Sequence, residues 1–322
     1  MRRLAAASLA LAHAYRLPSD CATLGGALQA ATGVFGRRDV PEAALSAEHL
    51  LCQAAGLGSD RGALSLRRSE ALSAEAREAF ESMCARRLER EPVQYILGEW
   101  DFLDLTLALR PPVLIPRPET EELVEHVLRA HADERSFLDV GCGSGAIGLA
   151  LIHRLGAARC LGVDISAAAT SLADENAERC GLASRYSTAL VTGGVAELAA
   201  SASAPARFDV IVSNPPYIPR ADMAALEPEV ATHEDDQALC GGADGLDVVR
   251  DVLRAAPLLL DPSGPRTVWM EVDTSHPPLI DEWLREAPQA ELRLEMRRWL
   301  PDACGRPRFV EIKWNGHEVM DP

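Results

Sequence analysis

The sequence is short of positive charge and of aromatic residues, which make up 5% of it. Both shortages count against a domain that recognises nucleic acid. Its 32 Lys and Arg residues face 48 Asp and Glu residues, which gives a formal net charge of −16 at pH 7. A protein that mainly grips nucleic-acid phosphates carries a basic patch or a high isoelectric point. We therefore expect no direct contact with nucleic acid.

The cysteines lack the spacing of a metal or redox motif. Eight are present, but none forms a CxxC pair and none lies at zinc-site spacing from a histidine. Scattered free thiols are typical of a reducing compartment, and we expect no metal site. Apolar runs of membrane-spanning length are also missing, so we expect no membrane association.

The first residues differ in composition from the rest. "MRRLAAASLALAHAYRLPS" contains Arg2, Arg3 and Arg16, is rich in Ala, and has no acidic residue before Asp20. This is typical of a mitochondrial transit peptide, although residues 4–14 also resemble a short secretory signal. The free thiols favour the mitochondrial interpretation. We predict a leader over residues 1–38 and a location in the mitochondrial matrix, the alternative being an Ala-rich helix of the mature protein.

Residues 39–98 have the pattern of a small helical domain. Apolar residues recur at helical spacing, and Ser73 is a suitable N-cap before "AEAREAF". Residues 99–118 follow as a hinge that alternates like a hairpin and then turns into a proline-rich loop. The remaining residues, 119–322, form the last predicted domain.

From residue 136 the pattern alternates between strand and helix. "SFLDV", "RCLGVD", "FDVIVS" and "TVWMEV" have the length and composition of buried strands, and amphipathic segments separate most of them. "RYSTALV" is a weaker strand, the third along the chain, and "FDVIVS" is the fourth. Such alternation predicts a parallel sheet covered by helices on both faces. "AELRLEMRRW" and "RFVEIKW" have no helix between them, so we expect this last pair to be antiparallel.

A glycine loop follows the first of these strands. "LDVGCGSGAIG" places Gly141, Gly143 and Gly145 before a helix, and Asp164 ends the next strand, where an acid binds ribose hydroxyls. Read from Gly143, the loop is a formal GxGxxG of dinucleotide-binding proteins. Read from Gly141, it is the looser loop of S-adenosylmethionine-dependent methyltransferases, which Asp139 at the strand end favours.

A stiff polar corner follows "FDVIV". In "SNPPYIP", Pro215 and Pro216 fix their own φ, and Pro215 holds Asn214 extended. Parallel strands present their carboxyl ends at one edge, so this corner and the glycine loop should face one pocket. The Asn214 Oδ1 atom and the Pro215 carbonyl can accept hydrogen bonds from the two N–H groups of an amide or aromatic amine. Tyr217 would pack against the flat acceptor group.

Taken together, the motifs resemble the HemK/PrmC family of glutamine-N5 methyltransferases. The resemblance runs from about residue 86 to 313, through "REPVQYILGEWDF", "VLIPRPETEELVE", "LDVGCGSGAIGLAL", "SNPPYI", "CGGADGLDVV" and "CGRPRFVEI". The wording is closest to the animal mitochondrial members. The resemblance implies an α/β fold: a Rossmann-like class I methyltransferase sheet of seven strands, with a small N-terminal helical domain for substrate recognition.

The family also implies roles for individual residues. S-adenosylmethionine would be the cofactor, and the partner would be the Gly-Gly-Gln loop of a peptide-chain release factor, bound by a protein that we expect to be a monomer. The expected cofactor-binding residues are Asp139, Gly141, Cys142, Gly143, Ser144, Gly145, Asp164 and Asn214. The expected substrate-binding residues are Asn214, Pro215, Pro216 and Tyr217, with Arg117, Glu119 and Thr120 bordering the pocket.

One departure and three alternatives remain. Family members carry an acid after the third strand, where this chain has Thr192 and Gly193 in "LVTGGVAE". "NPPY" also occurs in adenine-N6 methyltransferases acting on DNA or RNA, which makes that activity the main alternative. A cofactor-binding adaptor would be expected to have a decayed "NPPY", and a dehydrogenase would need an acid–base pair that the sequence does not offer.

Overall fold

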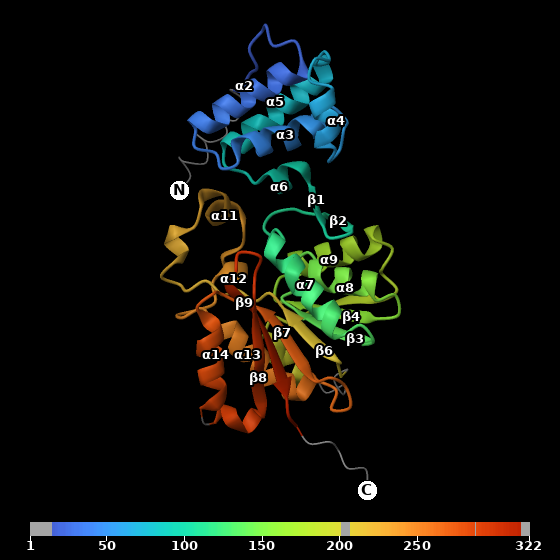
Figure 1. The fold of residues 1–322 in the computed structure, drawn as a ribbon, viewed down its shortest axis with the longest axis vertical. Helices are drawn as coiled ribbons and strands as arrows, with labels where there is room; N and C mark the ends of the chain where they lie inside the picture. Colours follow the sequence, from blue (N-terminus) through green and yellow to red (C-terminus); the bar gives the residue numbers. More distant parts are fainter. Residues whose placement is uncertain (1–14, 201–206, 287, 317–322) are drawn as a thin grey trace. The chain divides into compact units, whose positions relative to one another are not determined.

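The computed structural model describes residues 15–200, 207–286 and 288–316, and the chain forms two compact units (Figure 1). The first, here called the helical unit, consists of Met1–Gly98 and Pro228–His233. The second, the sheet unit, consists of Glu99–Glu227 and Glu234–Pro322. Most of the predicted leader's basic and Ala-rich stretch lies outside the described residues. Within those residues, no helix combines the length and hydropathy that crossing a bilayer requires.

The helical unit packs short amphipathic helices around fully buried side chains such as Phe35, Leu50 and Phe80. Ser73 caps one helix as predicted, because its hydroxyl accepts a hydrogen bond from the Ala76 N–H at 3.1 Å. The helices are α2 (Leu24–Arg37), α3 (Ala43–Ala54), α4 (Arg61–Leu66), α5 (Ala74–Leu88), α6 (Val93–Leu97) and α11 (Pro228–His233).

Helix α11 joins this unit from a distant part of the sequence. Its Glu229 is 7% exposed and accepts hydrogen bonds from Arg87 at 3.0 Å and Arg90 at 3.1 Å. The sequence predicted the helical domain as a continuous stretch over residues 39–98. A six-residue helix located after the "NPPY" corner therefore completes it.

The sheet unit contains seven strands in the order β5-β4-β3-β6-β7-β9-β8. The first five in that order are parallel, whereas β9 is antiparallel to both β7 and β8, which confirms the predicted antiparallel last pair. The strands are β3 (Ser136–Val140), β4 (Arg159–Asp164), β5 (Tyr186–Leu190), β6 (Val210–Ser213), β7 (Thr267–Glu271), β8 (Leu294–Pro301) and β9 (Pro307–Trp314).

Helices cover both faces of this sheet, as the alternation predicted (Figure 1). One face packs on α7 (Pro118–Ala130), α8 (Ala146–Arg154) and α9 (Ala167–Arg179), together with the hairpin of β1 (Glu99–Phe102) and β2 (Leu105–Ala108). The other face packs on α10 (Val195–Ala200), α13 (Asp247–Leu259) and α14 (His276–Arg285). Short helical turns occupy η1 (Met223–Ala225), α12 (Asp236–Leu239) and η2 (Gln289–Leu292).

The point where the strand order reverses lies between β3 and β6. From β3 the chain moves outward through β4 and β5, then returns to pair β6 with the other side of β3. The Ser213 hydroxyl donates to the Val140 carbonyl at 2.7 Å and fastens the carboxyl ends of these two strands together. Ligands of open α/β sheets bind at such a reversal.

Candidate active site

The glycine loop leaves β3 in a conformation that favours glycine. Gly141, Gly143 and Gly145 have φ values of +72°, +54° and +83°. At Gly145 a Cβ atom would also lie 3.0 Å from Leu149 and 3.2 Å from the Tyr186 hydroxyl. The loop therefore needs glycine both for its backbone angles and for the close approach of helix α8.

Asp164 joins this loop to the end of β4. Its Oδ2 atom accepts a hydrogen bond from the Gly143 N–H at 3.0 Å, and its Oδ1 atom accepts one from the Ser166 N–H at 2.9 Å. Burial raises the pKa of Asp164, and these N–H groups partly oppose the effect. Each carboxylate oxygen retains a second lone pair for a ligand hydroxyl.

A cavity of about 260 Å³ opens at the carboxyl ends of β3, β4 and β6. Its polar lining includes Asp164, Asn214 and the backbone of Gly141 and Gly143. Its apolar lining includes Ile165, Ala169, Val191 and Val195. A carboxylate for ribose hydroxyls beside an apolar wall for a flat base fits the nucleoside part of S-adenosylmethionine. The volume lies just below the usual small-molecule range of roughly 300–1,000 Å³.

The cavity wall is apolar at the place where the family carries an acid after the third strand. Val191, Gly194 and Val195 line the cavity where the family's acid was expected. The lining also includes Asp235 and Asp251, so a base in this cavity would meet apolar side chains, backbone groups and these two acids rather than an acid directly after the third strand.

Some predicted cofactor residues do not line the cavity. Asp139 is fully buried, and its Oδ2 atom accepts from the Gly148 N–H at 3.0 Å. Burial raises the pKa of Asp139 to about 7. This hydrogen bond joins the end of β3 to the first turn of α8, the two elements that flank the glycine loop. Cys142, Ser144 and Gly145 belong to the loop but are also absent from the lining.

The "NPPY" corner is held by a network of buried and partly buried hydrogen bonds. The Asn214 Nδ2 atom donates to Thr120 Oγ1 at 3.1 Å, and Thr120 Oγ1 donates to Glu271 Oε2 at 2.8 Å. The Tyr217 hydroxyl donates to Glu271 Oε1 at 3.3 Å. Asn214 and Pro216 line the cavity, whereas Pro215 and Tyr217 do not. The structure thus joins the predicted corner and the predicted border residue Thr120 through an acid that the sequence did not single out.

Glu271 was missed although one signal marks it. It ends β7, "TVWME", in which every residue is buried, and an acid there needs a partner. Its partner from β9 is Arg308, 3.9 Å away and held in turn by Asp302 at 3.2 Å. Burial raises the pKa of Glu271, although the bond from Thr120 and the charge of Arg308 act in the opposite direction.

A glycine segment supports the back of the same corner. A Cβ atom on Gly241 would lie 2.5 Å from the Pro216 carbonyl oxygen, and one on Gly245 would lie 2.3 Å from that of Tyr217. The Gly241 N–H donates to the Ile218 carbonyl at 2.9 Å. "CGGADG" therefore shapes the corner by direct backbone contact.

The other two predicted border residues form ion pairs. Arg117 contacts both carboxylate oxygens of Glu234 at 2.8 Å. Glu119 lies 3.7 Å from Arg306. Of the three border residues, only Thr120 enters the network around Asn214.

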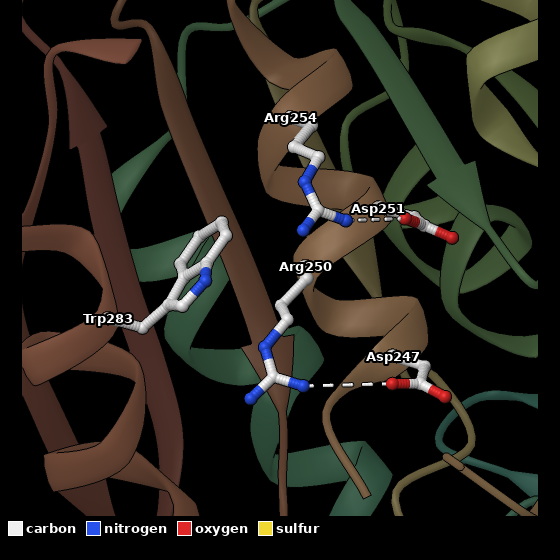
Figure 2. Close-up of a pocket in the computed structure, with 5 residues that line it drawn as sticks. All are labelled: Asp247, Arg250, Asp251, Arg254 and Trp283. Carbon is white, nitrogen blue, oxygen red and sulfur yellow. Dashed lines mark hydrogen bonds and ion pairs between the residues drawn. The ribbon is translucent and has the colours of Figure 1, made fainter. Parts of the chain in front are cut away.

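A second hollow lies on the surface of α13 and α14, and it shares Asp251 with the cavity at the strand ends. Figure 2 shows Arg254 paired with Asp251 and Arg250 with Asp247, beside Trp283. Arg250 also contacts Asp244 at 2.6 Å, and Arg254 lies 5.5 Å from the centre of the Trp283 ring. Both guanidinium groups are engaged with neighbouring acids, so we assign the active site to the cavity at the strand ends.

The sheet order, glycine loop, Asp164 and cavity define a class I S-adenosylmethionine-dependent methyltransferase. Two family models agree: the PrmC N-terminal domain matches residues 26–98, and the methyltransferase small domain matches residues 118–232. The catalytic domain of hMettl16, solved in complex with a MAT2A 3'UTR hairpin, covers 75% of this chain and 83% of its own at a TM-score of 0.52. At 17% identity it supports the fold alone.

Similar proteins identify the family. The MTRF1L release factor glutamine methyltransferase of Homo sapiens is 42% identical over 295 residues, which cover 88% of this chain and 86% of the relative. The release factor glutamine methyltransferase of Geobacter sulfurreducens is 43% identical, covering 75% and 80%, and that of Deinococcus radiodurans is 37% identical, covering 90% and 98%. The chain belongs to the release factor glutamine methyltransferase family.

Proposed function

We propose that this enzyme methylates the side-chain amide nitrogen, N5, of the glutamine in the Gly-Gly-Gln motif of peptide-chain release factors. The family's relatives are named for release factor glutamine methylation. These names favour glutamine over an aromatic amine, and the geometric observation that supports methylation of an –NH₂ group is the direction of the hydrogen bonds at Asn214. Its Nδ2 atom is used by Thr120, which leaves Oδ1 to accept from a substrate N–H.

Positioning is the main contribution that these residues can make. An amide nitrogen is a poor nucleophile because its lone pair is delocalised, and its two N–H groups are donors. The Asn214 Oδ1 atom accepts from one of them at the cavity, and the carbonyl of Pro215, which lies in the chain between the lining residues Asn214 and Pro216, accepts from the other, so that together they hold the nitrogen. Holding reacting groups in line can contribute roughly 7–11 kcal/mol in favourable cases.

S-adenosylmethionine supplies a methyl group activated by a positively charged sulfur. The residues that would hold it are Asp164, Asn214 and the backbone of Gly141 and Gly143, which line the cavity. No strong base is required of the chain, since an alkylated amide nitrogen loses its proton readily.

Mass spectrometry of a release factor incubated with the enzyme and S-adenosylmethionine tests the function. We expect a single methyl group on the glutamine side-chain nitrogen. DNA, tRNA and rRNA are offered in parallel. Methylated adenine with unmodified glutamine would transfer the assignment to the adenine-N6 alternative.

We also propose that the helical unit recognises the body of the release factor. Its support is the match of residues 26–98 to the PrmC N-terminal domain, a part of the chain in which we find no catalytic residue. A free Gly-Gly-Gln peptide should then have a much lower kcat/KM than the folded protein. Equal values would leave recognition to the cavity alone.

A mitochondrial location is proposed on the composition of the first residues. Tyr15 and Leu17 are buried in the helical unit, and the Leu17 N–H donates to Glu81 at 3.0 Å. Helix α2 also contributes the buried Phe35, so cleavage at residue 38 would remove part of the core. We therefore place the end of the leader before Tyr15. A reporter fused to residues 1–40 should enter mitochondria, and a diffuse cytosolic signal would contradict the proposal.

A further inference from the structure

Two hydrogen bonds link Glu271 to Asn214 through the Thr120 hydroxyl, and each has only one permitted donor. An ionised carboxylate only accepts hydrogen bonds, so the Thr120 hydroxyl must donate its single hydrogen to Glu271. The oxygen of Thr120 then accepts, and the group of Asn214 that faces it must be the NH₂. The carboxylate thus determines which end of the Asn214 amide faces the cavity.

We propose that Glu271 and Thr120 are positioning residues that keep the Asn214 Oδ1 atom turned toward the substrate glutamine. This inference rests on the proposed function. With the amide reversed, the NH₂ of Asn214 would face the NH₂ of the substrate, and two donors cannot bond to each other. The enzyme would then lose one of its two acceptors for the reacting nitrogen.

The rest of the network holds Glu271 in place for this role. Glu271 is 1% exposed, so water does not compete for its oxygens. Its Oε1 atom accepts from Tyr217, at the far end of the same "NPPY" corner, and Arg308 approaches it from β9. One carboxylate therefore holds both polar ends of the corner, Tyr217 directly and Asn214 through Thr120.

Glu271 and Thr120 act through Asn214 rather than on the substrate. Neither lines the cavity, whereas Asn214 does. Within the described part of the chain, the bond to Thr120 is the one hydrogen bond of the Asn214 side chain. Removing it leaves the amide free to turn.

Thr120→Val tests the inference, because valine keeps the shape of threonine without its hydroxyl. We expect kcat for glutamine methylation to fall about tenfold to a hundredfold, as for one lost polar contact in the transition state. The Kd for S-adenosylmethionine, measured by calorimetry, should stay within about twofold. Thr120→Ser, which retains the hydroxyl, should recover kcat to within about threefold of the unmodified enzyme.

A second measurement reports the orientation of Asn214 itself. A release factor with Gly-Gly-Glu in place of Gly-Gly-Gln presents a carboxylate, which the outward Oδ1 atom repels and an outward NH₂ group would attract. Thr120→Val should therefore reduce the preference of binding for glutamine over glutamate by about tenfold. A residue that only filled space would not change this ratio.

The outcomes separate the inference from the function on which it rests. If the unmodified enzyme leaves glutamine unmethylated, the proposed function fails. If it methylates glutamine but Thr120→Val keeps kcat within threefold and the same preference, the positioning role alone is overturned. Loss of activity in Thr120→Ser as well as in Thr120→Val would also overturn it, as a packing effect. Should Thr120→Val not fold, Thr120→Ala is judged by the same criteria.

Discussion

Two buried glutamates, one in each unit, show how surroundings determine the role of an acid. Glu229 of the helical unit is 7% exposed, and Glu271 of the sheet unit is 1% exposed. The pKa of Glu229 is lowered: burial raises it, but the hydrogen bonds from the backbone, Arg90 and Arg87 outweigh burial. The pKa of Glu271 is raised, because burial outweighs the bond from Thr120 and the more distant Arg308.

The difference lies in the partners. Glu229 meets two guanidinium groups at 3.0 and 3.1 Å, an ion pair that joins α11 to helix α5 and the residues that follow it. Glu271 accepts hydrogen bonds from the hydroxyl groups of Thr120 and Tyr217, and the guanidinium group of Arg308 is 3.9 Å away. At Glu229 the main effect of the partners is to neutralise charge, whereas at Glu271 it is to fix the direction of hydrogen bonds. A substitution of Glu229 should therefore mainly lower the stability of the protein, and a substitution in the Glu271 network should mainly lower the catalytic rate.

The largest expected effect is on stability, at Glu229. Glu229→Gln leaves Arg87, itself 3% exposed, without its buried counter-charge. Breaking such a pair costs about 3–5 kcal/mol. Urea unfolding followed by circular dichroism should show this loss in the transition of the helical unit. Glu227→Gln, at an exposed position two residues earlier, is the matched control and should change stability little. Equal effects of the two variants would show that the ion pair contributes nothing.

The next effect is on catalysis, at the end of the network that Glu271 controls. Asn214→Ala removes the acceptor for the substrate amide, and losing one preorganised polar contact costs about 2.7–4 kcal/mol, or a hundredfold to a thousandfold in rate. We expect kcat to fall by this factor and the Kd for S-adenosylmethionine to change much less. Asn315→Ala, an exposed change at the end of β9, should leave kcat intact. Near-normal turnover of Asn214→Ala would show that "NPPY" serves only as a rigid turn.

A smaller effect extends the comparison to two aspartates around the glycine loop. Asp164 lines the cavity, whereas Asp139 is fully buried behind the loop. Asp164→Ala should weaken S-adenosylmethionine binding about tenfold to a hundredfold, since hydrogen bonds to a charged group contribute about 1.5–3 kcal/mol. Asp139→Asn should leave that affinity within about twofold, because the residue does not reach the ligand. Calorimetry that found the reverse order would exchange their roles, and tight NAD binding would overturn the cofactor assignment.

The parts of this molecule that the sequence predicted are those encoded by adjacent residues. The strands of the sheet were visible because short β-branched runs alternate with amphipathic helices, and "NPPY" and the glycine loop are local motifs. The coupling of Thr120 to Glu271 spans 151 positions, and that of Arg87 to Glu229 spans 142. Such partners become neighbours only when the chain folds. The direction in which Asp139 points depends in the same way on the packing of α8 against β3.

The smallest effect is the opposite dependence of the two glutamates on pH. A lowered pKa means that Glu229 contributes stability that is complete above the unfolded-state pKa of about 4.5 and is lost as pH falls through the lower, folded-state value. A raised pKa means that Glu271 contributes stability below about 4.5 that is lost as pH rises through its folded-state value. Each unit of pKa difference corresponds to about 1.4 kcal/mol.

The difference in unfolding free energy between the unmodified protein and Glu229→Gln should therefore shrink in acid. Glu271→Gln should gain stability relative to the unmodified protein as pH rises from 4 to 7. Unfolding free energies measured over that range check both signs, and parallel curves for the two variants would remove the distinction between a charge pair and a directional network.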